Sequence, residues 1–538
     1  MDGTGESGPQ DWGPFGRPLF NDPSTRALRR VGVVDVGSNS VRLVVFDGAA
    51  RSPAYFYNEK IMCGLGEGLG RTGRLNPAGR ERALAALHRF QHLAEGMGIA
   101  PLTAVATAAV RNAEDGPEFC DQIARETGLR VHVIDGREEA RLSAQGVMLG
   151  WPGAYGLICD IGGASMELAE INSGSVGRRV TSPLGPLQLQ TVKGGRNGRR
   201  EFIRKTLERL APQLGAQKNR LFLVGGSWRA IARIDIARRG YPLHVLHEYR
   251  MSRKAISSTL KLIADTKDLE KLRQKSGVSA SRMALVPLAA EVLREVIRAF
   301  HPHDIAVSSY GIREGLLYEQ MPQELRDRDP LIEACRFAEA KDARLPGFGR
   351  SLYHFILPLF SSVDEDRKRL IRAACLLHDV NWRAHPDYRA EACFDSVTRA
   401  NLGGLTHRER VYLGLALMYR YSNKRDDSRF AQVANLLGDA DIHQAEVLGK
   451  AMRFGAMLWV QGAPLGELRW FPRKKELELW LSRHAEPLFS EVAEARLNSL
   501  AQTLAARTRV KRRRTLPDAE TPTLPAAAAA PEAGPTTP

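Results

Sequence analysis

The chain has 538 residues, of which 43% are hydrophobic and 26% charged, values ordinary for a soluble globular protein. This length exceeds one hydrophobic core, so we expect roughly three or four domains. No apolar run approaches the ~20 residues that span a bilayer, and the acidic, Gly/Pro-rich N-terminus lacks the apolar core of a secretory signal. The six cysteines are scattered without a C-x-x-C pair, which is typical of reduced thiols. Together these features predict a cytoplasmic protein with no membrane partner.

The formal net charge of +16 lies almost wholly on the body of the chain. Residues 505–538 carry six Lys/Arg against three acids, and residues 1–28 carry two against four. A basic body favours an anionic partner, such as nucleic acid, a membrane surface or a polyphosphorylated substrate. A surface charge that serves solubility alone is the alternative.

Both ends of the chain have the composition of disordered tails. Residues 1–28 are polar and rich in Gly and Pro, and the chain after Leu516 ends in PTLPAAAAAPEAGPTTP. The run RTRVKRRR, Arg507 to Arg514, indicates a basic tail within the terminal segment 505–538. It could touch nucleic acid or polyphosphate, but a solvated flanking run is the simpler interpretation.

Between the tails, strand and helix patterns alternate along the first 320 residues. VGVVDVG (31–37) and SVRLVVFDG (40–48) predict strands, a helix is expected over 80–97, and LTAVATAAV (102–110) and VHVIDG (131–136) predict further strands. After a helix over 140–149 the pattern starts again with GLICDIGG (156–163). It continues through a basic helix near 199–214 to IAVSSYGIREGLLYE (305–319). This alternation indicates an α/β fold that contains an internal duplication.

After about Pro322 strand signals vanish, and helical periodicity dominates to residue 510. We therefore predict two α/β domains, residues 29–150 and 151–321, followed by a helical domain over 322–504.

The two halves share one polar turn between apolar strands. VVDVGSNSVRLVVF contains Asp35 and ICDIGGASMELAEI contains Asp160, about 125 residues later. Glycine at such a turn lets an anion approach the backbone N–H groups, and a serine hydroxyl adds a donor. An aspartate would repel phosphate unless a divalent cation or a polarised water lies between them, and Mg²⁺ is usually bound by one or two carboxylates together with substrate phosphates. A single D-x-G turn is common, but two equivalent copies predict a phosphate site.

Six motifs resemble, in their order and spacing, those of the exopolyphosphatase and guanosine pentaphosphate phosphatase family. They are GVVDVGSNSVRLVVF, ATAAVRNA, DGREEARL, CDIGGASMEL, FLVGGSWRAI and YGIREGLLYE. The resemblance covers about residues 30–320 and extends more loosely into the helical part, as in the long form of the family. It implies two duplicated domains of the actin, Hsp70 and sugar-kinase (ribonuclease H-like) fold with a cleft between them, followed by an all-α HD-like domain.

The resemblance also implies a catalytic base. Hydrolysis of a phosphoanhydride needs a positioned water, a base and positive charge around the phosphoryl group. In DGREEARL, Glu139 matches the family's base that activates water, and Glu138 is the less favoured candidate. The alternative is two exposed acids favoured at a helix start by the macrodipole.

The metal and phosphate ligands are implied in the same way. Asp160 and Glu167 match the acids that hold Mg²⁺, and Asp35, on the opposite turn, is expected to help orient the metal or the water. Arg111 matches the family's phosphate-binding arginine, a donor fork suited to a phosphoryl group. The remaining expected phosphate ligands are small or hydroxyl residues at turns and strand ends: Gly37, Ser38, Asn39, Ser40, Thr107, Gly162, Gly163, Ser165, Gly225, Gly226 and Ser227.

Two further features bear on the substrate. Trp228 stands where a small polar residue is expected, which argues against a bound nucleoside beside the Gly225–Ser227 turn. The segment 191–220 carries nine basic against two acidic residues, and we expect either part of a cation track for a long polyphosphate or a solvated helix face.

The pair His378–Asp379, in RLIRAACLLHDVNWRAHPDY, resembles the HD pair of metal-dependent phosphohydrolases. The upstream helix GFGRSLYHFILPLF and the downstream helix LGKAMRFGAMLWV lack the other expected ligands. Too few ligands remain for a metal site, so we predict a degenerate HD scaffold that serves dimerisation or extends the substrate channel.

The preferred hypothesis is a Mg²⁺-dependent exopolyphosphatase that removes terminal phosphates processively from inorganic polyphosphate, with no specific nucleic acid partner. The close alternative is hydrolysis of guanosine pentaphosphate (pppGpp) in the same cleft. An ATP-dependent kinase is a second class, disfavoured because a kinase must avoid the water activation that Glu139 implies, and a non-catalytic sensor is a third. A homodimer is implied by the resemblance alone.

Overall fold

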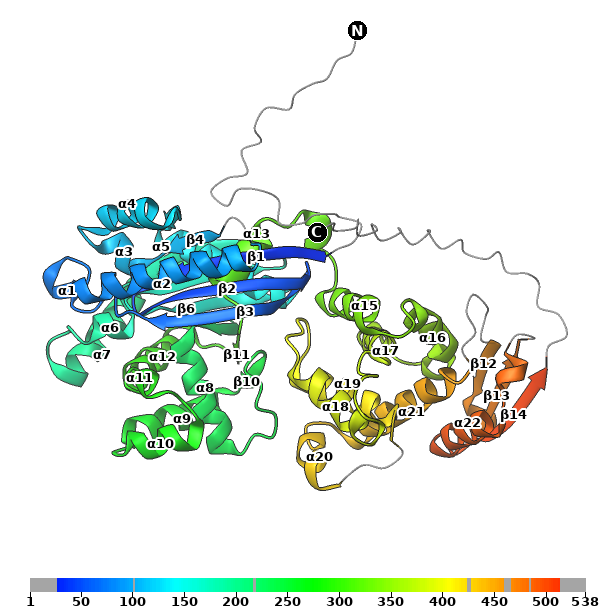
Figure 1. Ribbon diagram of the computed structural model, residues 1–538. Coiled ribbons are helices and arrows are strands. Elements are labelled where there is room, and N and C mark those ends of the chain that lie inside the picture. Colours follow the sequence, from blue (N-terminus) through cyan, green and yellow to red (C-terminus); the bar gives the residue numbers. More distant parts are fainter. Residues whose placement is uncertain are drawn as a thin grey trace, which may run out of the picture.

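The computed structural model describes residues 27–512 except 100–101, 216–218, 423–426, 459–465 and 483–484. The expected tails before residue 27 and after residue 512 therefore lie outside the described residues. Within the described part, no helix is long and apolar enough to cross a membrane. Figure 1 shows two α/β lobes beside a helical region that carries a small sheet at its far end.

The first lobe is built on a five-stranded sheet in the order β3-β2-β1-β4-β5. Strands β1, β2 and β3 are antiparallel, and β4 and β5 run parallel to β1. The strands are β1 (Ala27–Val36), β2 (Ser40–Ala49), β3 (Ser52–Met62), β4 (Thr103–Ala106) and β5 (Val131–Val133). Its helices are α1 (Leu69–Thr72), α2 (Pro77–Gly96), α3 (Ala108–Asn112) and α4 (Gly116–Thr127).

The second lobe repeats this plan with an additional edge strand. Its sheet has the order β10-β11-β9-β6-β7-β8, in which β6, β7 and β8 are antiparallel and β9 and β11 continue parallel to β6. The strands are β6 (Tyr155–Ile161), β7 (Met166–Asn172), β8 (Ser175–Ser182), β9 (Arg220–Val224), β10 (Tyr249–Met251) and β11 (Asp304–Val307). The helices are α6 (Pro186–Leu189), α7 (Gly195–Leu210), α8 (Gly226–Arg239), α9 (Arg253–Asp265), α10 (Leu269–Ser276), α11 (Ala280–Met283) and α12 (Val286–Phe300). The matching strand order confirms the predicted duplication.

Two helices pack between the sheets and join the lobes. They are α5 (Gly136–Gly150) and α13 (Ile312–Glu319), which contact each other closely. Leu142 of α5 and Leu316 of α13 join the core under the first sheet, whereas Ala144 and Val147 of α5 join the core under the second. A displacement of α5 would therefore change the packing under both sheets.

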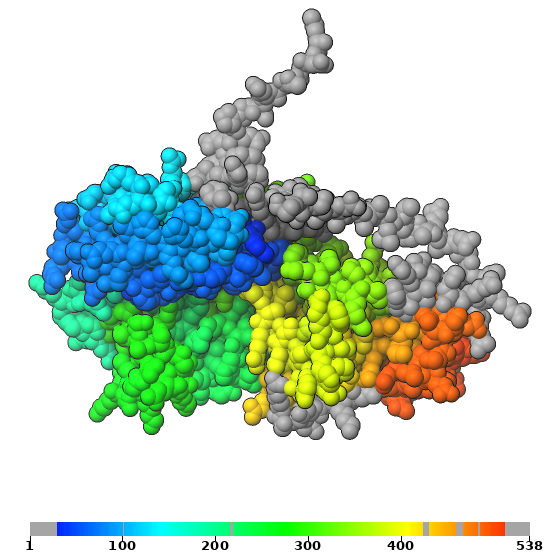
Figure 2. Space-filling view, in the orientation of Figure 1, coloured from blue at the N-terminus to red at the C-terminus, as the bar shows by residue number. Residues whose placement is uncertain are grey.

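The helical region begins with α14 (Gln323–Arg326) and lies against both lobes in Figure 2. Its helices are α15 (Pro330–Asp342), α16 (Phe348–Ile356), α17 (Glu365–Leu377), α18 (Pro386–Arg399), α19 (His407–Tyr419), α20 (Asp427–Ala434), α21 (Asp439–Gly455) and α22 (Glu491–Thr503). The side-chain amide of Asn401 donates to the Pro53 carbonyl of the first lobe, at 3.2 Å.

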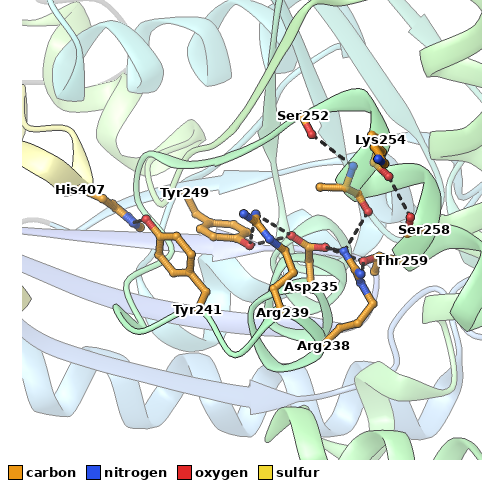
Figure 3. A network of polar contacts seen from close by, with 11 residues as sticks. Asp235, Arg238, Arg239, Tyr241, Tyr249, Ser252, Lys254, Ser258, Thr259 and His407 are labelled. Atoms are coloured by element: carbon orange, nitrogen blue, oxygen red, sulfur yellow. Dashed lines mark hydrogen bonds and ion pairs between the residues drawn. The ribbon is translucent and has the colours of Figure 1, made fainter. Parts of the chain in front are cut away.

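His407 connects α19 to the second lobe through a polar network, shown in Figure 3. Its Nε2 lies 3.1 Å from the carbonyl oxygen of His247 and its Nδ1 lies 3.0 Å from the Tyr241 hydroxyl. Because a carbonyl oxygen only accepts, Nε2 carries the proton and Nδ1 accepts from the tyrosine. The ring of Tyr241 packs edge-on against Tyr249, whose hydroxyl donates to the buried carboxylate of Asp235, at 2.6 Å. This network fixes the second lobe to the helical region.

The prediction that strands are absent after Pro322 is wrong. A three-stranded sheet, β12-β13-β14, consists of β12 (Gly466–Phe471), β13 (Glu476–Leu481) and β14 (Arg507–Arg512). The residues expected to open a disordered basic tail thus form β14, which runs parallel to β13. Arg507 pairs with Glu476 at 3.0 Å and Lys511 pairs with Glu478 at 2.8 Å. The run looked solvated because its neutralising acids lie some 30 residues earlier in the chain.

The α5–α13 contact yields a stability prediction. A methyl group at Gly315 would overlap the Leu142 carbonyl oxygen, and one at Gly146 would overlap the Gly311 backbone. We expect Gly315→Ala to lower the free energy of unfolding by about 1–3 kcal/mol, because overpacking outweighs the higher helix propensity of alanine. Urea unfolding measures the change.

The matched control is Gly96→Ala, at the exposed end of α2, where an added Cβ meets no atom within 4 Å. We expect this variant to be unchanged or slightly more stable. Equal effects of the two substitutions would contradict the close-packing argument.

Candidate active site

The two predicted turns face each other across a cleft of about 220 Å³ between the lobes. Each turn is closed by the same bond, because the Gly37 amide donates to the Ser40 carbonyl and the Gly162 amide donates to the Ser165 carbonyl, both at 3.0 Å. The turns nearly touch: a Cβ added at Gly163 would lie 3.2 Å from that of Ser38. An anion between them would meet backbone and hydroxyl donors from both lobes.

Most of the predicted site residues line this cleft. These are Asp35, Gly37, Ser38, Asn39, Ser40, Thr107, Glu139, Asp160, Gly162, Gly163, Ser165, Gly225, Gly226 and Ser227. Arg111 and Glu167 lie directly behind it, where Arg111 contacts Glu139 and Glu167 is the strand partner of Asp160. Gly225 has φ +108°, and a Cβ there would lie 2.6 Å from the Ile161 carbonyl oxygen, so this strand-to-helix turn requires glycine.

Glu139 lies in the first turn of α5, at the cleft wall. The Asp135 side chain caps this helix by accepting from the Glu138 amide at 2.7 Å. Glu139 is 5% exposed, and Arg111 Nη1 lies 3.3 Å from its Oε2 while donating to the Ile134 carbonyl at 2.7 Å. Burial, followed by repulsion from Asp160, raises the pKa of Glu139 to about 8. A pKa near the working pH is typical of a general base, and a cation bound beside Asp160 would lower this pKa and so favour the ionised carboxylate that accepts a proton.

Glu138, the neighbouring acid, has a structural partner instead. Its carboxylate binds Arg141 of the same helix at 2.6 Å. Arg141 in turn pairs with Glu319 of α13. Glu138 is absent from the residues that line the cleft, so the structure places Glu139 and not Glu138 beside the phosphate turns.

Asp160 and Glu167 lie side by side on adjacent strands, since they are register partners of β6 and β7. Asp160 accepts from the Ser143 hydroxyl, and Glu167 Oε1 accepts from the Thr181 hydroxyl at 3.1 Å. Glu167 is only 1% exposed, and its Oε2 is buried without a hydrogen-bond partner among the described residues. Burial raises the pKa of both carboxyls, and for Glu167 repulsion from Glu139 and Asp160 adds to the rise.

This donor set fits a Mg²⁺ ion. An orphaned buried carboxylate oxygen beside a second carboxylate is a position that a hard divalent cation would neutralise. Within the described chain no group of three or more His, Cys, Asp or Glu residues forms a complete metal site. Asp160 and Glu167 would therefore hold the ion together with substrate phosphate oxygens and water, which is how Mg²⁺ is commonly bound. Asp35 lines the cleft on the opposite turn; burial raises its pKa, against the attraction of Arg313 and Arg42.

Five cations in the cleft wall were not among the predicted site residues: Arg42, Lys60, Arg229, Arg282 and Arg313. They come from β2, β3, α8, α11 and α13, so only the tertiary structure gathers them. Burial and mutual repulsion lower the pKa of Arg42 to about 10 and that of Lys60 to about 8. The available signals were weak: Arg42 lies two residues after Ser40, and Arg313 lies inside the quoted motif YGIREGLLYE.

The structure gives new information on the two features that bear on the substrate. Trp228 is 0% exposed in the core of the second lobe, where its Nε1 donates to the Cys159 carbonyl at 3.1 Å, so it does not narrow the cleft. None of the described basic residues of segment 191–220 lines the cleft. Arg199 of α7 pairs with Glu291 at 2.9 Å and Lys205 pairs with Glu201 at 2.8 Å. These ion pairs with local acids favour the second alternative for this segment, a solvated helix face.

The His378–Asp379 pair has partners of its own. Arg344 donates to the Asp379 carboxylate through Nη2 at 2.6 Å and through Nε at 3.0 Å. His378 is buried against the Phe348 ring, and burial together with Arg420 lowers its pKa to about 3. The aspartate at this position is thus bound to an arginine.

Comparison with known proteins identifies the family of the chain. The model of the Ppx/GppA phosphatase family matches residues 44–324, just over half of the chain. The chain belongs to this family. The model of the exopolyphosphatase C-terminal region matches residues 344–510. The predicted fold class, two α/β domains followed by a helical C-terminal region, is therefore confirmed, and the protein is a phosphatase.

Individual relatives cover different parts of the chain. Exopolyphosphatase 1 of Mycobacterium tuberculosis is 27% identical over 327 residues, covering 57% of this chain and 92% of that protein. Retrograde regulation protein 2 of Saccharomyces cerevisiae is 25% identical over 455 residues, covering 76% of each. The crystal structure of an exopolyphosphatase from Cytophaga hutchinsonii matches with a TM-score of 0.50 and 25% identity, covering 54% of this chain and 97% of that one.

The buried carboxyls make stability depend on pH in a way that Glu139→Gln should reveal. The pKa of Glu139 is about 8 in the folded protein against 4.5 ordinarily, so the folded state binds more protons between these values. Stability is therefore lost as pH rises through this window. In the absence of metal, raising the pH from 5 to 8 should lower the free energy of unfolding of the wild type by roughly 2–4 kcal/mol more than that of Glu139→Gln. Urea unfolding at both pH values in EDTA measures it, and parallel pH profiles of the two proteins would contradict the burial argument.

Proposed function

We propose that this phosphatase is an exopolyphosphatase, which hydrolyses the terminal phosphoanhydride bond of inorganic polyphosphate and releases orthophosphate. The observation that carries the proposal is the composition of one cleft. Two turns suited to bind phosphate, the carboxyl of Glu139 and five cations line the same cleft. A polyanionic substrate whose terminal phosphate reaches Glu139 matches this combination of charges.

The turn amides and the Ser38 and Ser165 hydroxyls would hold the terminal phosphoryl group. Glu139 would accept a proton from the attacking water while the water oxygen bonds to phosphorus and the bridging P–O bond breaks. Arg111, held by the Ile134 carbonyl, orients the Glu139 carboxylate. Mg²⁺ bound by Asp160 and Glu167 would offset the charge that develops on the phosphoryl oxygens.

The five cations that line the cleft, here called the cation wall, favour an inorganic polyphosphate chain over a nucleotide. Each further phosphate adds negative charge, which the guanidinium and ammonium groups of the wall can bind. No aromatic side chain occurs among the described residues that line the cleft, so a guanine base would find no ring to stack on. This observation replaces Trp228 as the reason to prefer polyphosphate to pppGpp.

The experiment that tests the proposal is phosphate release from long-chain polyphosphate and from pppGpp, each with Mg²⁺ and with EDTA. We expect rapid release from polyphosphate only when Mg²⁺ is present. Faster turnover of pppGpp would reverse the order of substrates, and full activity in EDTA would contradict the metal assignment.

Glu139→Gln should separate chemistry from binding. We expect kcat to fall by about 10²–10⁴, the usual contribution of a general base, while polyphosphate binding remains. Single-turnover phosphate release and equilibrium binding measure the two effects. Glu138→Gln is the matched control and should keep most of the activity; the reverse result would exchange the roles of the two glutamates.

The cation wall yields a prediction about KM. Lys60→Gln and Arg42→Gln should each raise the KM for polyphosphate about tenfold with little change in kcat, because a charge-assisted hydrogen bond is worth about 1.5 kcal/mol. Arg200→Gln on α7 is the control, since Arg200 is exposed and lies outside the cleft. If the control raised KM as strongly as the wall variants, the substrate track would run over α7 instead.

A further inference from the structure

A second charged cavity, of about 330 Å³, lies in the helical region between α15, α16 and α17. It shares no lining residue with the active-site cleft. Its walls contain five cations and three carboxylates, with one aromatic and one aliphatic side chain. The residues are Arg328, Arg336, Lys368, Arg369, Arg372, Asp329, Glu333, Glu365, Tyr353 and Ile332.

The three carboxylates of this cavity are already engaged by cations of the same wall. Asp329 accepts from Arg369 through both oxygens. Glu333 accepts from Arg336 at 3.1 Å. Glu365 accepts from Lys368 at 2.8 Å. The cavity therefore keeps an excess of about two positive charges.

Arg328 and Arg372 carry this excess of positive charge. Arg328 Nη1 lies 3.7 Å from Glu333, beyond hydrogen-bond distance, and is buried without a hydrogen-bond partner among the described residues. For Arg372, the structure as described shows no carboxylate within ion-pair distance. Burial and the neighbouring guanidinium groups of Arg336 and Arg350 lower its pKa. Among the described residues, Arg328 has only the long ion pair with Glu333 and Arg372 has no carboxylate partner, so two guanidinium groups that face one cavity can still bind an anion.

We propose that this cavity is a second binding site of the protein and takes a small phosphorylated ligand of nucleotide size. Phosphate oxygens are the acceptors that the planar donor forks of Arg328 and Arg372 match best. The Tyr353 ring and Ile332 supply an apolar wall for the rest of the ligand, and the volume lies in the usual range for small-molecule sites. The inorganic tripolyphosphate ion shares the phosphate chemistry without the apolar part.

The cavity is connected to the helix that carries Glu139. Arg369 Nη2 donates to the Gly404 carbonyl at 2.8 Å, and the Gly404 amide donates to the carbonyl of Gly150, the last residue of α5, at 2.6 Å. Arg51 makes a parallel link, since its Nε donates to the Arg328 carbonyl at 3.1 Å and its Nη1 to the Leu149 carbonyl at 2.5 Å.

Glu139 lies at the opposite end of the same helix. A ligand that rearranges Arg328 and Arg369 would act on the position of α5, and we infer that the site regulates the cleft in this way. This regulatory part rests on the proposed function, whereas the binding part does not.

Binding is tested by calorimetric titration of the full-length Glu139→Gln protein, which should not consume its ligand, with tripolyphosphate and separately with GTP. We expect two sites per chain for at least one of the probes. Adding Arg328→Gln and Arg372→Gln should remove one site, and adding Lys60→Gln and Arg42→Gln should weaken the other. Unchanged stoichiometry in the Arg328/Arg372 variant, or a single site that the Lys60/Arg42 variant weakens, would overturn the proposal.

Two controls protect this result from a folding defect. Arg372→Lys keeps the charge without the fork, and we expect it to bind two- to tenfold more weakly at the second site with an unchanged melting temperature. Arg473→Gln, at an exposed turn before β13, should bind as the parent does. Tighter binding of GTP than of tripolyphosphate would identify a nucleotide as the ligand class, and the reverse would identify an inorganic phosphate chain.

The regulatory part is tested by phosphate release in the wild type and in Arg372→Gln, each with the tighter probe present. Competition in the cleft affects both proteins equally, so only the difference between them reports the second site. We expect kcat to change at least twofold in the wild type alone. Equal responses would overturn the regulatory part, and absence of any phosphate release would overturn the proposed function while the titration still decides on the site.

Discussion

The structure depends on the close packing of α5 against α13 between the two sheets. Gly146 and Gly315 allow the backbones to touch, so that one helix from the end of each lobe fills the space that both lobes share. Because α5 carries Glu139 at its first turn, this contact also sets the distance between the base and the two phosphate turns. The contact between α5 and α13 therefore determines both the packing of the lobes and the geometry of the site.

The electrostatics of the cleft follow from that arrangement. Asp160, Glu167 and Glu139 are brought together in a buried place, and burial raises the pKa of each carboxyl; repulsion from neighbouring carboxylates adds to the rise, from Asp35 for Asp160 and from Asp160 for the two glutamates. The surrounding arginines reduce this repulsion, but no described residue donates a hydrogen bond to Glu167 Oε2. Under the proposed function, a cation and a phosphate chain would satisfy the buried carboxylates and the cations of this site.

The helical region is connected to the lobes at several points rather than by one linker. His407 contacts the second lobe, Asn401 contacts the first, and Gly404 contacts the end of α5. The family model for the exopolyphosphatase C-terminal region covers this part of the chain. Contacts with both lobes and with the helix between them give the region a route by which binding in its own cavity can reach the cleft.

The sequence by itself determined the α/β class, the duplication and the two turns, whereas Glu139 was chosen among the acids through the family resemblance of DGREEARL. These features are local: a glycine turn between apolar strands is encoded within about 15 consecutive residues, and its second copy can be recognised by eye. Only the tertiary structure decided which cations line the cleft, because Arg42, Lys60, Arg229, Arg282 and Arg313 come from five separate elements. It also decided that Trp228 is core and that residues 507–512 form a strand, since burial and ion-pair partners depend on residues distant in the chain. Charge and size are written in the sequence, but what each side chain faces is set by packing.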